Sequence, residues 1–204
     1  LGPGEFGVIF ATPETGKTAC AVSFCAAPKG FCHQGAKVLY LGNEEKTSRT
    51  MLRVIQSCTN MTKKQILEDP TKAAESFAKI KDNIEMKDIQ DWSLDEVEGF
   101  IEKMKPDLVV IDQADKVHIG GSFAASHERL RELYRRFREL AKRYDCGLLV
   151  VSQASAEAKG RTKLSPFEME GSKIGKSAET DLILGIGKIE NDSEEAEQDL
   201  TRYI

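Results

Sequence analysis

Glycine, lysine and threonine stand side by side near the start of the chain, as Gly16, Lys17 and Thr18. An apolar run at residues 7–10 precedes them and a helical pattern follows, which is the order of strand, loop and helix that a phosphate-binding loop requires. In such a loop the glycine lets the backbone approach phosphate, Lys17 reaches the β and γ oxygens, and Thr18 ligates magnesium. These residues predict a site for ATP with Mg²⁺.

The predicted loop opens with Ala11, where the general GxxxxGK[ST] pattern has its first glycine, so this position must tolerate a Cβ. A Gly-Lys-Thr tripeptide alone can fall at a strand-to-helix turn by accident. The strand before it, the helix after it and the acidic strand ends elsewhere favour the functional interpretation. The residues that we assign to nucleotide binding are Thr12, Pro13, Glu14, Thr15, Gly16, Lys17, Thr18 and Ala19.

Carboxylates follow two other apolar runs. Residues 108–111 lead into Asp112, the form of a strand whose aspartate holds the water shell of magnesium, although an aspartate there is often only a cap. Residues 37–42 are followed by Glu44 and Glu45, at the sheet edge where ligands of open α/β sheets bind. A glutamate there can activate the attacking water. We assign the metal to Asp112 with the loop threonine, and the catalytic base to Glu44, with Glu45 as rival; two solvated acids opening a helix are the alternative.

A third strand ends in a polar residue. Residues 147–151 are followed by Ser152 and Gln153 at the edge where the γ-phosphate would lie. An amide there can sense that phosphate and pass the signal into the next loop, although a glutamine after a strand is ordinary without such context. The predicted catalytic residues are therefore Lys17, Glu44 and Gln153.

The elements that must position these residues alternate along the chain. Near-continuous apolar strands separated by helices indicate an α/β fold with a doubly wound, mainly parallel sheet flanked by helices. Ser93 and Ser126 are predicted N-caps. The expected strands are residues 7–12, 37–42, 84–89, 108–112, 147–153 and 181–186, and the expected helices are 16–27, 47–58, 62–67, 71–81, 93–105 and 126–144.

Bulk composition narrows the class of protein. The 204 residues fit a single α/β domain over 1–204, with an ordinary 40% hydrophobic and 30% charged residues. A net charge of −4 gives no overall basic field for nucleic acid. The five cysteines form no CxxC pair, and no apolar run reaches the roughly 18 to 20 residues of a membrane helix, so we expect a cytoplasmic protein. Both ends read as cuts in a longer chain.

These elements in this order resemble the RecA-like ATPase domain of the DnaB family of hexameric replicative helicases, and its phage members in particular. That family shares the departure at Ala11. The resemblance rests on Pro3-Gly4-Glu5, on the Ala-x-Pro-x-x-Gly-Lys-Thr loop, on Glu44 followed by Met51-Leu52-Arg53, on Val110-Ile111-Asp112, on Val151-Ser152-Gln153, and on Glu170-Gly171-Ser172 ahead of Ala178-Glu179-Thr180-Asp181-Leu182.

The resemblance implies an ATP-hydrolysing motor that couples hydrolysis at subunit interfaces to translocation of single-stranded DNA, as a hexameric ring of the full-length protein. It also implies that Arg53 lies near the nucleotide phosphates, whereas the residues alone leave Arg53 as a solvent-facing helix residue. In that family a lysine and an arginine finger reach the site from a neighbouring subunit, from the strand that would follow Ile204. We therefore expect this stretch alone to hydrolyse ATP slowly.

Two loops face DNA in that family, and they correspond here to residues 115–126 and 154–177. The second is basic in an acidic chain and contains glycine, serine and threonine, which suits contact with phosphate backbone by a flexible loop. A solvated loop without a ligand is the alternative. The five basic residues of this loop are Lys159, Arg161, Lys163, Lys173 and Lys176. We assign DNA binding to Lys159, Arg161, Lys163, Gly171, Ser172 and Lys173.

Two other classes of function remain open from the sequence. A recombination or regulatory ATPase similar to RecA, RadA or KaiC would share the core but form filaments or signalling rings, and strand exchange rather than unwinding would identify it. A P-loop kinase of small molecules would carry an arginine-rich lid and would need no base at Glu44.

Overall fold

One parallel sheet organises the chain, and the computed structural model describes residues 1–171, 173–188 and 202–204. Six strands lie in the order β3-β2-β4-β5-β1-β6, and every neighbouring pair is parallel. This confirms the predicted doubly wound fold. The strands are β1 (Phe6–Ala11), β2 (Val38–Gly42), β3 (Ile84–Asp88), β4 (Leu108–Asp112), β5 (Gly147–Gln153) and β6 (Leu182–Ile186).

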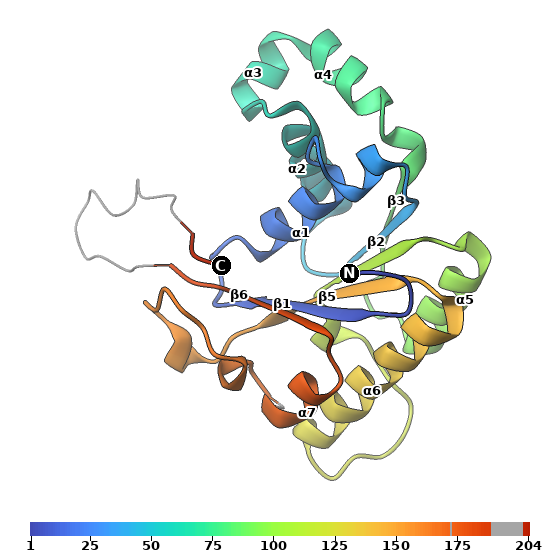
Figure 1. The fold of residues 1–204 in the computed structure, drawn as a ribbon, viewed down its shortest axis with the longest axis vertical. Helices are drawn as coiled ribbons and strands as arrows, with labels where there is room; N and C mark the ends of the chain where they lie inside the picture. The colour runs from blue at the N-terminus through green and yellow to red at the C-terminus, as the bar shows by residue number, and fades with distance from the viewer. Residues whose placement is uncertain (172, 189–201) are drawn as a thin grey trace.

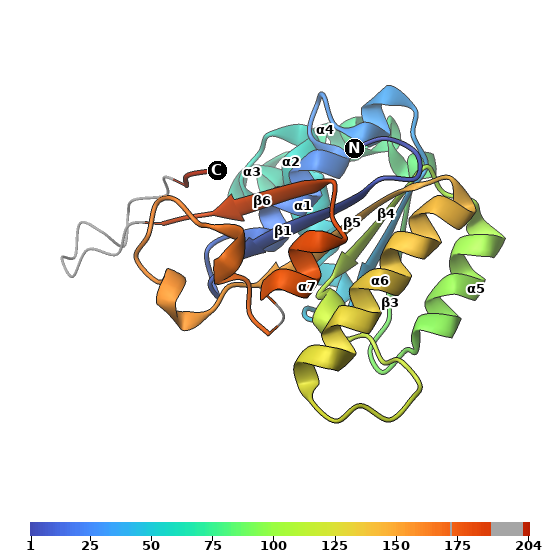
Figure 2. The same cartoon turned by 60° about the horizontal axis from the view of Figure 1, so that its bottom comes forward.

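Helices cover both faces of the sheet. In Figures 1 and 2, α1 and α2 lie on one face with α3 and α4 beyond them, and α5, α6 and α7 lie on the other. Short 3-10 turns join several of these elements. The helices are α1 (Lys17–Ala26), α2 (Thr47–Thr59), α3 (Lys63–Glu68), α4 (Pro70–Ala78), α5 (Leu94–Met104), α6 (Ser126–Tyr144) and α7 (Lys173–Ala178), and the turns are η1 (Phe31–Gln34), η2 (Lys81–Asn83), η3 (Ala114–Lys116), η4 (Ala156–Ala158) and η5 (Pro166–Glu168).

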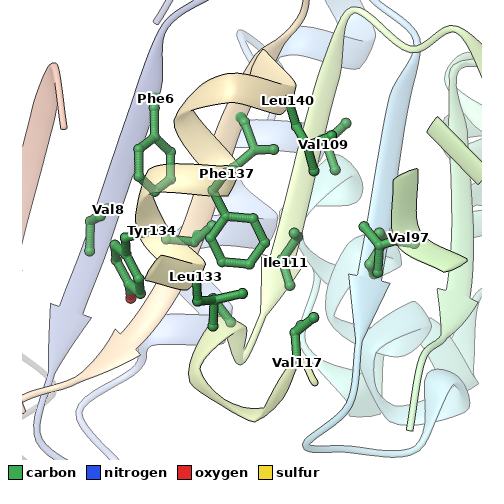
Figure 3. Close-up of a cluster of buried hydrophobic side chains, with 14 of the residues drawn as sticks. Phe6, Val8, Val97, Val109, Ile111, Val117, Leu133, Tyr134, Phe137 and Leu140 are labelled. Atoms are coloured by element: carbon green, nitrogen blue, oxygen red, sulfur yellow. The ribbon is translucent and has the colours of Figure 1, made fainter. Parts of the chain in front are cut away.

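Each strand contributes to two cores because its side chains alternate between the faces of the sheet. In β4, Val109 and Ile111 pack under α5 and α6, whereas Leu108 and Val110 pack under α1 and α2. The core under α6 is aromatic. Figure 3 shows Phe6 of β1 beside two rings of α6, with centroids 5.8 Å from Tyr134 and 6.1 Å from Phe137. Burial on both faces accounts for the near-continuous apolar strands of the sequence.

The two predicted N-caps have different outcomes. Ser93 caps α5 as predicted: its hydroxyl accepts from the Glu96 N–H at 3.3 Å, and the Glu96 carboxylate accepts from the Ser93 N–H at 2.8 Å. The prediction for Ser126 is wrong. Ser126 is the first residue of α6, its N-cap is Ala125, and no side chain bonds from that cap. The carboxylate of Glu128 covers this helix start instead, accepting from the Ala124 N–H at 3.2 Å.

Helix α7 lies inside the stretch that the sequence assigned to a loop. Its six residues read Lys-Ile-Gly-Lys-Ser-Ala, too short and too polar to show a helical period. None of the helices in the described part of the chain combines the length and the apolar character that crossing a bilayer requires.

Candidate nucleotide site

The loop between β1 and α1 is shaped to receive an anion. Gly16, the residue before α1, has φ 101°, a conformation that glycine adopts readily and residues with side chains rarely do. The hydroxyls of Thr12 and Thr15 share a hydrogen bond of 2.8 Å that braces the loop. Pro13, Glu14 and Ala19 are exposed. Because α1 begins at Lys17, the free N–H groups and positive dipole end of the helix lie at this loop.

Lys17 is the centre of positive charge in the loop. Its ammonium donates to the Thr12 carbonyl at 3.0 Å, and only 6% of the residue is exposed. Burial lowers the pKa of Lys17, and the negative charges of Glu44 and Asp112 oppose that shift. The predicted phosphate ligand therefore lies within the electric field of both predicted acidic residues.

Thr18 and Asp112 lie in direct contact, although they come from different parts of the chain. One carboxylate oxygen of Asp112, Oδ2, accepts from the Thr18 hydroxyl at 2.7 Å and from the Tyr40 hydroxyl at 2.9 Å. Burial raises the pKa of Asp112, and these two hydrogen bonds act in the opposite direction. Tyr40 was not predicted as a site residue, because an aromatic residue within an apolar strand has the pattern of a core side chain.

The pair of Thr18 and Asp112 fits a magnesium ion. The second carboxylate oxygen of Asp112, Oδ1, is buried and has no hydrogen-bond partner in the described part of the chain. A buried oxygen left without a donor is costly unless a ligand completes its contacts. A carboxylate and a hydroxyl beside a phosphate-binding loop are the oxygen ligands that Mg²⁺ takes in such sites.

The two rival glutamates after β2 have different surroundings. Arg53 of α2 is paired with Glu45, with its Nη2 3.1 Å from Oε1 and its Nε 3.4 Å from Oε2. No hydrogen bond or ion pair engages the carboxylate of Glu44 among the described residues, and Glu44 is exposed. A cavity of about 520 Å³ contains the site, and its lining residues are Glu14, Gly16, Lys17, Thr18, Ala19, Glu44, Glu45, Arg49 and Arg53.

Asn43 fixes the end of β2 against the end of β4. Its backbone N–H donates to the Asp112 carbonyl at 2.7 Å, and its side-chain oxygen accepts from the Gln113 N–H at 2.6 Å. Its amide donates to the Gln113 carbonyl at 3.0 Å, and the peptide bond between Asp112 and Gln113 is cis. These bonds hold Glu44 at a set place relative to Asp112. The sequence analysis missed Asn43, whose only signal is its place directly after a strand.

Gln153 lies beside the first residue of the loop. At the end of β5 it pairs in register with Ala11, so its backbone is next to the point where the loop leaves the sheet. Its side chain is partly buried. The arrangement brings Gln153 to the same sheet edge as Lys17, Glu44 and Asp112, and its role as a phosphate sensor stays a prediction.

The basic loop after β5 is folded back on itself. Ala154 and Met169 form an antiparallel bridge, and the Glu170 N–H donates to the Gln153 carbonyl at 2.9 Å. Lys159 and Lys163 are exposed. The guanidinium of Arg161 is 2.6 Å from the buried carboxylate of Glu168, so its charge is already compensated.

The remaining residues assigned to DNA binding are less defined. Gly171 is exposed with φ 86°, Ser172 lies outside the described residues, and Lys173 opens α7 with its side chain outside them too. Lys176 corrects an expectation. The sequence counted it among the solvent-facing charges of a flexible loop, yet it is fully buried, because acidic and hydroxyl partners from other elements surround its ammonium.

One further contact to the loop comes from the last described residues. Arg202 donates through Nε to the Thr15 carbonyl at 2.8 Å. The neighbouring Tyr203 pairs with Gly187 in an antiparallel bridge next to β6. The sequence offered no signal for this contact because Arg202 and Thr15 are far apart in the chain.

The strand order and the loop after β1, opposite an acidic end on β4, define a P-loop protein of the RecA-like class. Residues 1–159 match the model of a family described as the AAA domain, and the chain belongs to that family. No curated protein matches the sequence.

Solved structures with the same fold include an ATPase domain and a replicative helicase. The first, described as the ATPase domain of a larger protein, matches with a TM-score of 0.81 at 18% identity, over 95% of this chain and 74% of that one. A DnaB-like replicative helicase, solved together with its interactions with primase, matches with a TM-score of 0.77 at 18% identity. That match covers 95% of this chain and 50% of the helicase, so the chain spans about half of that protein. The predicted RecA-like ATPase fold is confirmed.

Proposed function

We propose that this chain is the ATP-hydrolysing motor domain of a replicative DNA helicase, which couples hydrolysis at subunit interfaces to movement along single-stranded DNA. The observation that carries the proposal is the convergence of Lys17, Thr18, Asp112 and Glu44 at one sheet edge. The fold shared with a solved ATPase domain and with a DnaB-like replicative helicase supports it.

The binding step uses the loop. Backbone N–H groups at the start of α1 and the ammonium of Lys17 would take the phosphates, since both present positive charge to the same space. Thr18 and Asp112 would hold Mg²⁺. When bound, this ion neutralises charge that develops on the phosphate oxygens.

The hydrolytic step uses Glu44. Its carboxylate lines the cavity, engages no donor in the described part of the chain, and lies near enough to Lys17 and Asp112 to affect their pKa values. It would orient the attacking water and accept its proton. Arg53, held by Glu45 at the cavity wall, is in reach of the phosphates by exchanging that partner for a phosphate oxygen.

The proposed partners are single-stranded DNA and further copies of the full-length chain in a hexameric ring. Exposed Lys159 and Lys163 on the folded loop after β5 would contact the DNA backbone. Fingers from the neighbouring subunit would complete the site, so this domain alone would turn over slowly. The proposal puts the protein in the cytoplasm of a bacterium or of a phage-infected host.

The test is ATP hydrolysis by the full-length parent protein, with and without single-stranded DNA. The proposal expects hydrolysis that requires Mg²⁺, that single-stranded DNA stimulates, and that Lys17→Ala abolishes because the β and γ phosphates lose their cationic partner. Phosphoryl transfer to a nucleoside or a sugar, or unchanged turnover in Lys17→Ala, would refute it. Unwinding of a forked duplex, as opposed to strand exchange, separates a helicase from a recombinase.

A further inference from the structure

A buried ion pair lies directly behind the nucleotide site. The ammonium of Lys176 is fully buried, 2.8 Å from Oδ2 of Asp115 and 2.9 Å from the hydroxyl of Ser152, to both of which it donates. Ser152 itself donates to the same Asp115 oxygen at 2.8 Å. The hydroxyl of Tyr134 donates to the other oxygen, Oδ1, at 3.0 Å, and the Lys176 ammonium lies 4.9 Å from the centre of the Tyr134 ring. We refer to these four residues as the Lys176 cluster.

The Lys176 cluster joins segments that are separate in the chain. Asp115 belongs to η3, directly after the metal-binding end of β4, and Ser152 is the residue before Gln153 in β5. Tyr134 comes from α6, and Figure 3 shows its hydroxyl on the side of the ring away from Phe6. Lys176 comes from α7. The cluster therefore connects both predicted DNA-facing loops to the ends of two strands that line the nucleotide site.

The backbone on the Asp115 side of the cluster is held independently. The guanidinium of Arg129, from α6, donates to the Asp115 carbonyl at 2.8 Å and to the Val117 carbonyl at 3.1 Å. Asp115 is thus fixed to α6 by its main chain and remains fixed if Lys176 is removed. On the other side α7 has six residues, too few for a helix to be stable without tertiary contacts.

A buried ammonium is a demanding contact because it has to keep its partners. Burial lowers the pKa of Lys176, and the Asp115 carboxylate opposes that shift. Leaving either member alone would strand an uncompensated charge, so α7 cannot shift away from η3 and β5 without breaking the pair as a unit. Contacts that exist in one arrangement or another, rather than stretching gradually, are what transmit a change between sites.

We propose that Lys176 is a positioning residue that ties α7, and with it the loop of residues 154–171, to the ends of β4 and β5, so that nucleotide binding and DNA binding are coupled. The inference rests on the proposed function. It assigns the coupling to a side chain that touches neither ligand.

The test compares Lys176→Met with Lys142→Met in the full-length protein. Methionine keeps the length of the side chain and removes its charge, and Lys142 is an exposed lysine of α6 that controls for the loss of one positive charge. The measurements are ATP hydrolysis with and without oligo-dT, and oligo-dT affinity with and without a non-hydrolysable ATP analogue. Lys176→Met is expected to keep basal kcat and KM within about twofold while the analogue's effect on oligo-dT affinity falls by about tenfold. Lys142→Met is expected to match the wild type.

The outcomes separate the two proposals. A wild-type protein that oligo-dT does not stimulate refutes the proposed function and the coupling with it. A stimulated wild type with equal coupling in Lys176→Met refutes the coupling alone. So does a loss of basal turnover parallel to a loss of stability, because that is the result of a purely structural contact. If Lys176→Met does not fold, Ser152→Ala removes one acceptor of the same ammonium; reduced coupling with normal basal turnover supports the proposal, and full coupling overturns it.

Discussion

Arg53 and Glu45 form a two-pronged ion pair, with nitrogen-to-oxygen distances of 3.1 and 3.4 Å. The pair engages the carboxylate of Glu45 and leaves that of Glu44 to the cavity. The structure therefore separates two adjacent acids that the sequence could not separate. It favours Glu44 as the residue that activates water, because a carboxylate already accepting two N–H bonds from a guanidinium is a poor base.

The first prediction concerns this choice. Glu44→Gln keeps the shape of the side chain and removes the proton acceptor, so ATP hydrolysis is expected to fall by about 10² to 10⁴. ATP affinity should stay close to that of the wild type, because Lys17 and the loop are untouched. Single-turnover hydrolysis and equilibrium binding measure the two effects separately.

Glu45→Gln is the matched control for that prediction. It loosens Arg53 without touching the base, so we expect a change in KM for ATP and a kcat within about tenfold of the wild type. An equal loss of kcat in Glu45→Gln, with Glu44→Gln active, would move the base to Glu45.

The second prediction concerns Tyr40, whose hydroxyl orients Asp112 at 2.9 Å. Tyr40→Phe removes one hydrogen bond, worth about 1 kcal/mol, and so the Mg²⁺ concentration for half-maximal hydrolysis should rise by about fivefold. Tyr144→Phe is the control, because it removes a hydroxyl that bonds to Glu98 instead. A magnesium titration that is identical in Tyr40→Phe and wild type would contradict the positioning role.

The third prediction concerns the basic loop. Arg161 is already paired with Glu168, so its removal would disturb the loop as well as any DNA contact, and the cleaner variant is Lys159→Ala with Lys163→Ala. Each lost phosphate contact lowers the salt slope of single-strand binding by about 0.7, so the double variant should lower it by about 1. Alanine at the exposed Lys103 and Lys142 is the control. An unchanged slope would return the loop to an ordinary solvated surface.

The fourth prediction is a pH dependence of stability on α6. Glu132 accepts from Arg135 at 2.8 Å and from Arg136 at 3.0 Å, and these hydrogen bonds lower its pKa to about 2. A lowered pKa in the folded state gives stability that is present above the ordinary pKa of about 4.3 and is lost as the pH falls through the folded-state value. The residues are partly exposed, so the contribution is about 1 kcal/mol or less.

Urea unfolding of wild type and Glu132→Gln at several pH values checks this. The stability difference between the two should be largest at neutral pH and should shrink steadily below about pH 4, where the carboxylate of the unfolded chain takes up its proton. A difference that stays constant from pH 7 to about pH 3 would show that the ion pairs do not contribute.

Local patterns predicted the parts of this molecule that depend on local sequence. Apolar runs located all six strands to within a residue or so at their ends, and polar residues at the ends of β2, β4 and β5 located the site. Ser93 was found from its capping pattern with Glu96. Ser126 was not, because one residue decides whether a serine precedes a helix or opens it.

The features that the sequence did not predict depend on partners far away in the chain. Lys176 lies among glycine and serine, a pattern of solvated loop, and only Asp115 and Ser152 make its burial possible. Tyr40 reads as an ordinary strand residue until Asp112 is placed beside it. The contact of Arg202 with Thr15 likewise depends on the register of the C-terminal residues against β6.

The neighbours of β1 also set the order in which this domain can be built. Phe6 pairs with Leu148 and Gly7 with Leu182, so the strand that carries the nucleotide loop gains its two partners only after most of the domain has been synthesised. At roughly 5 to 20 residues per second, an apolar strand and the loop behind it wait for several seconds on the ribosome. ATP cannot stabilise a nascent chain during that interval, because its binding site does not yet exist. Growth temperature and chaperone supply should therefore govern the yield of this domain more strongly than nucleotide does.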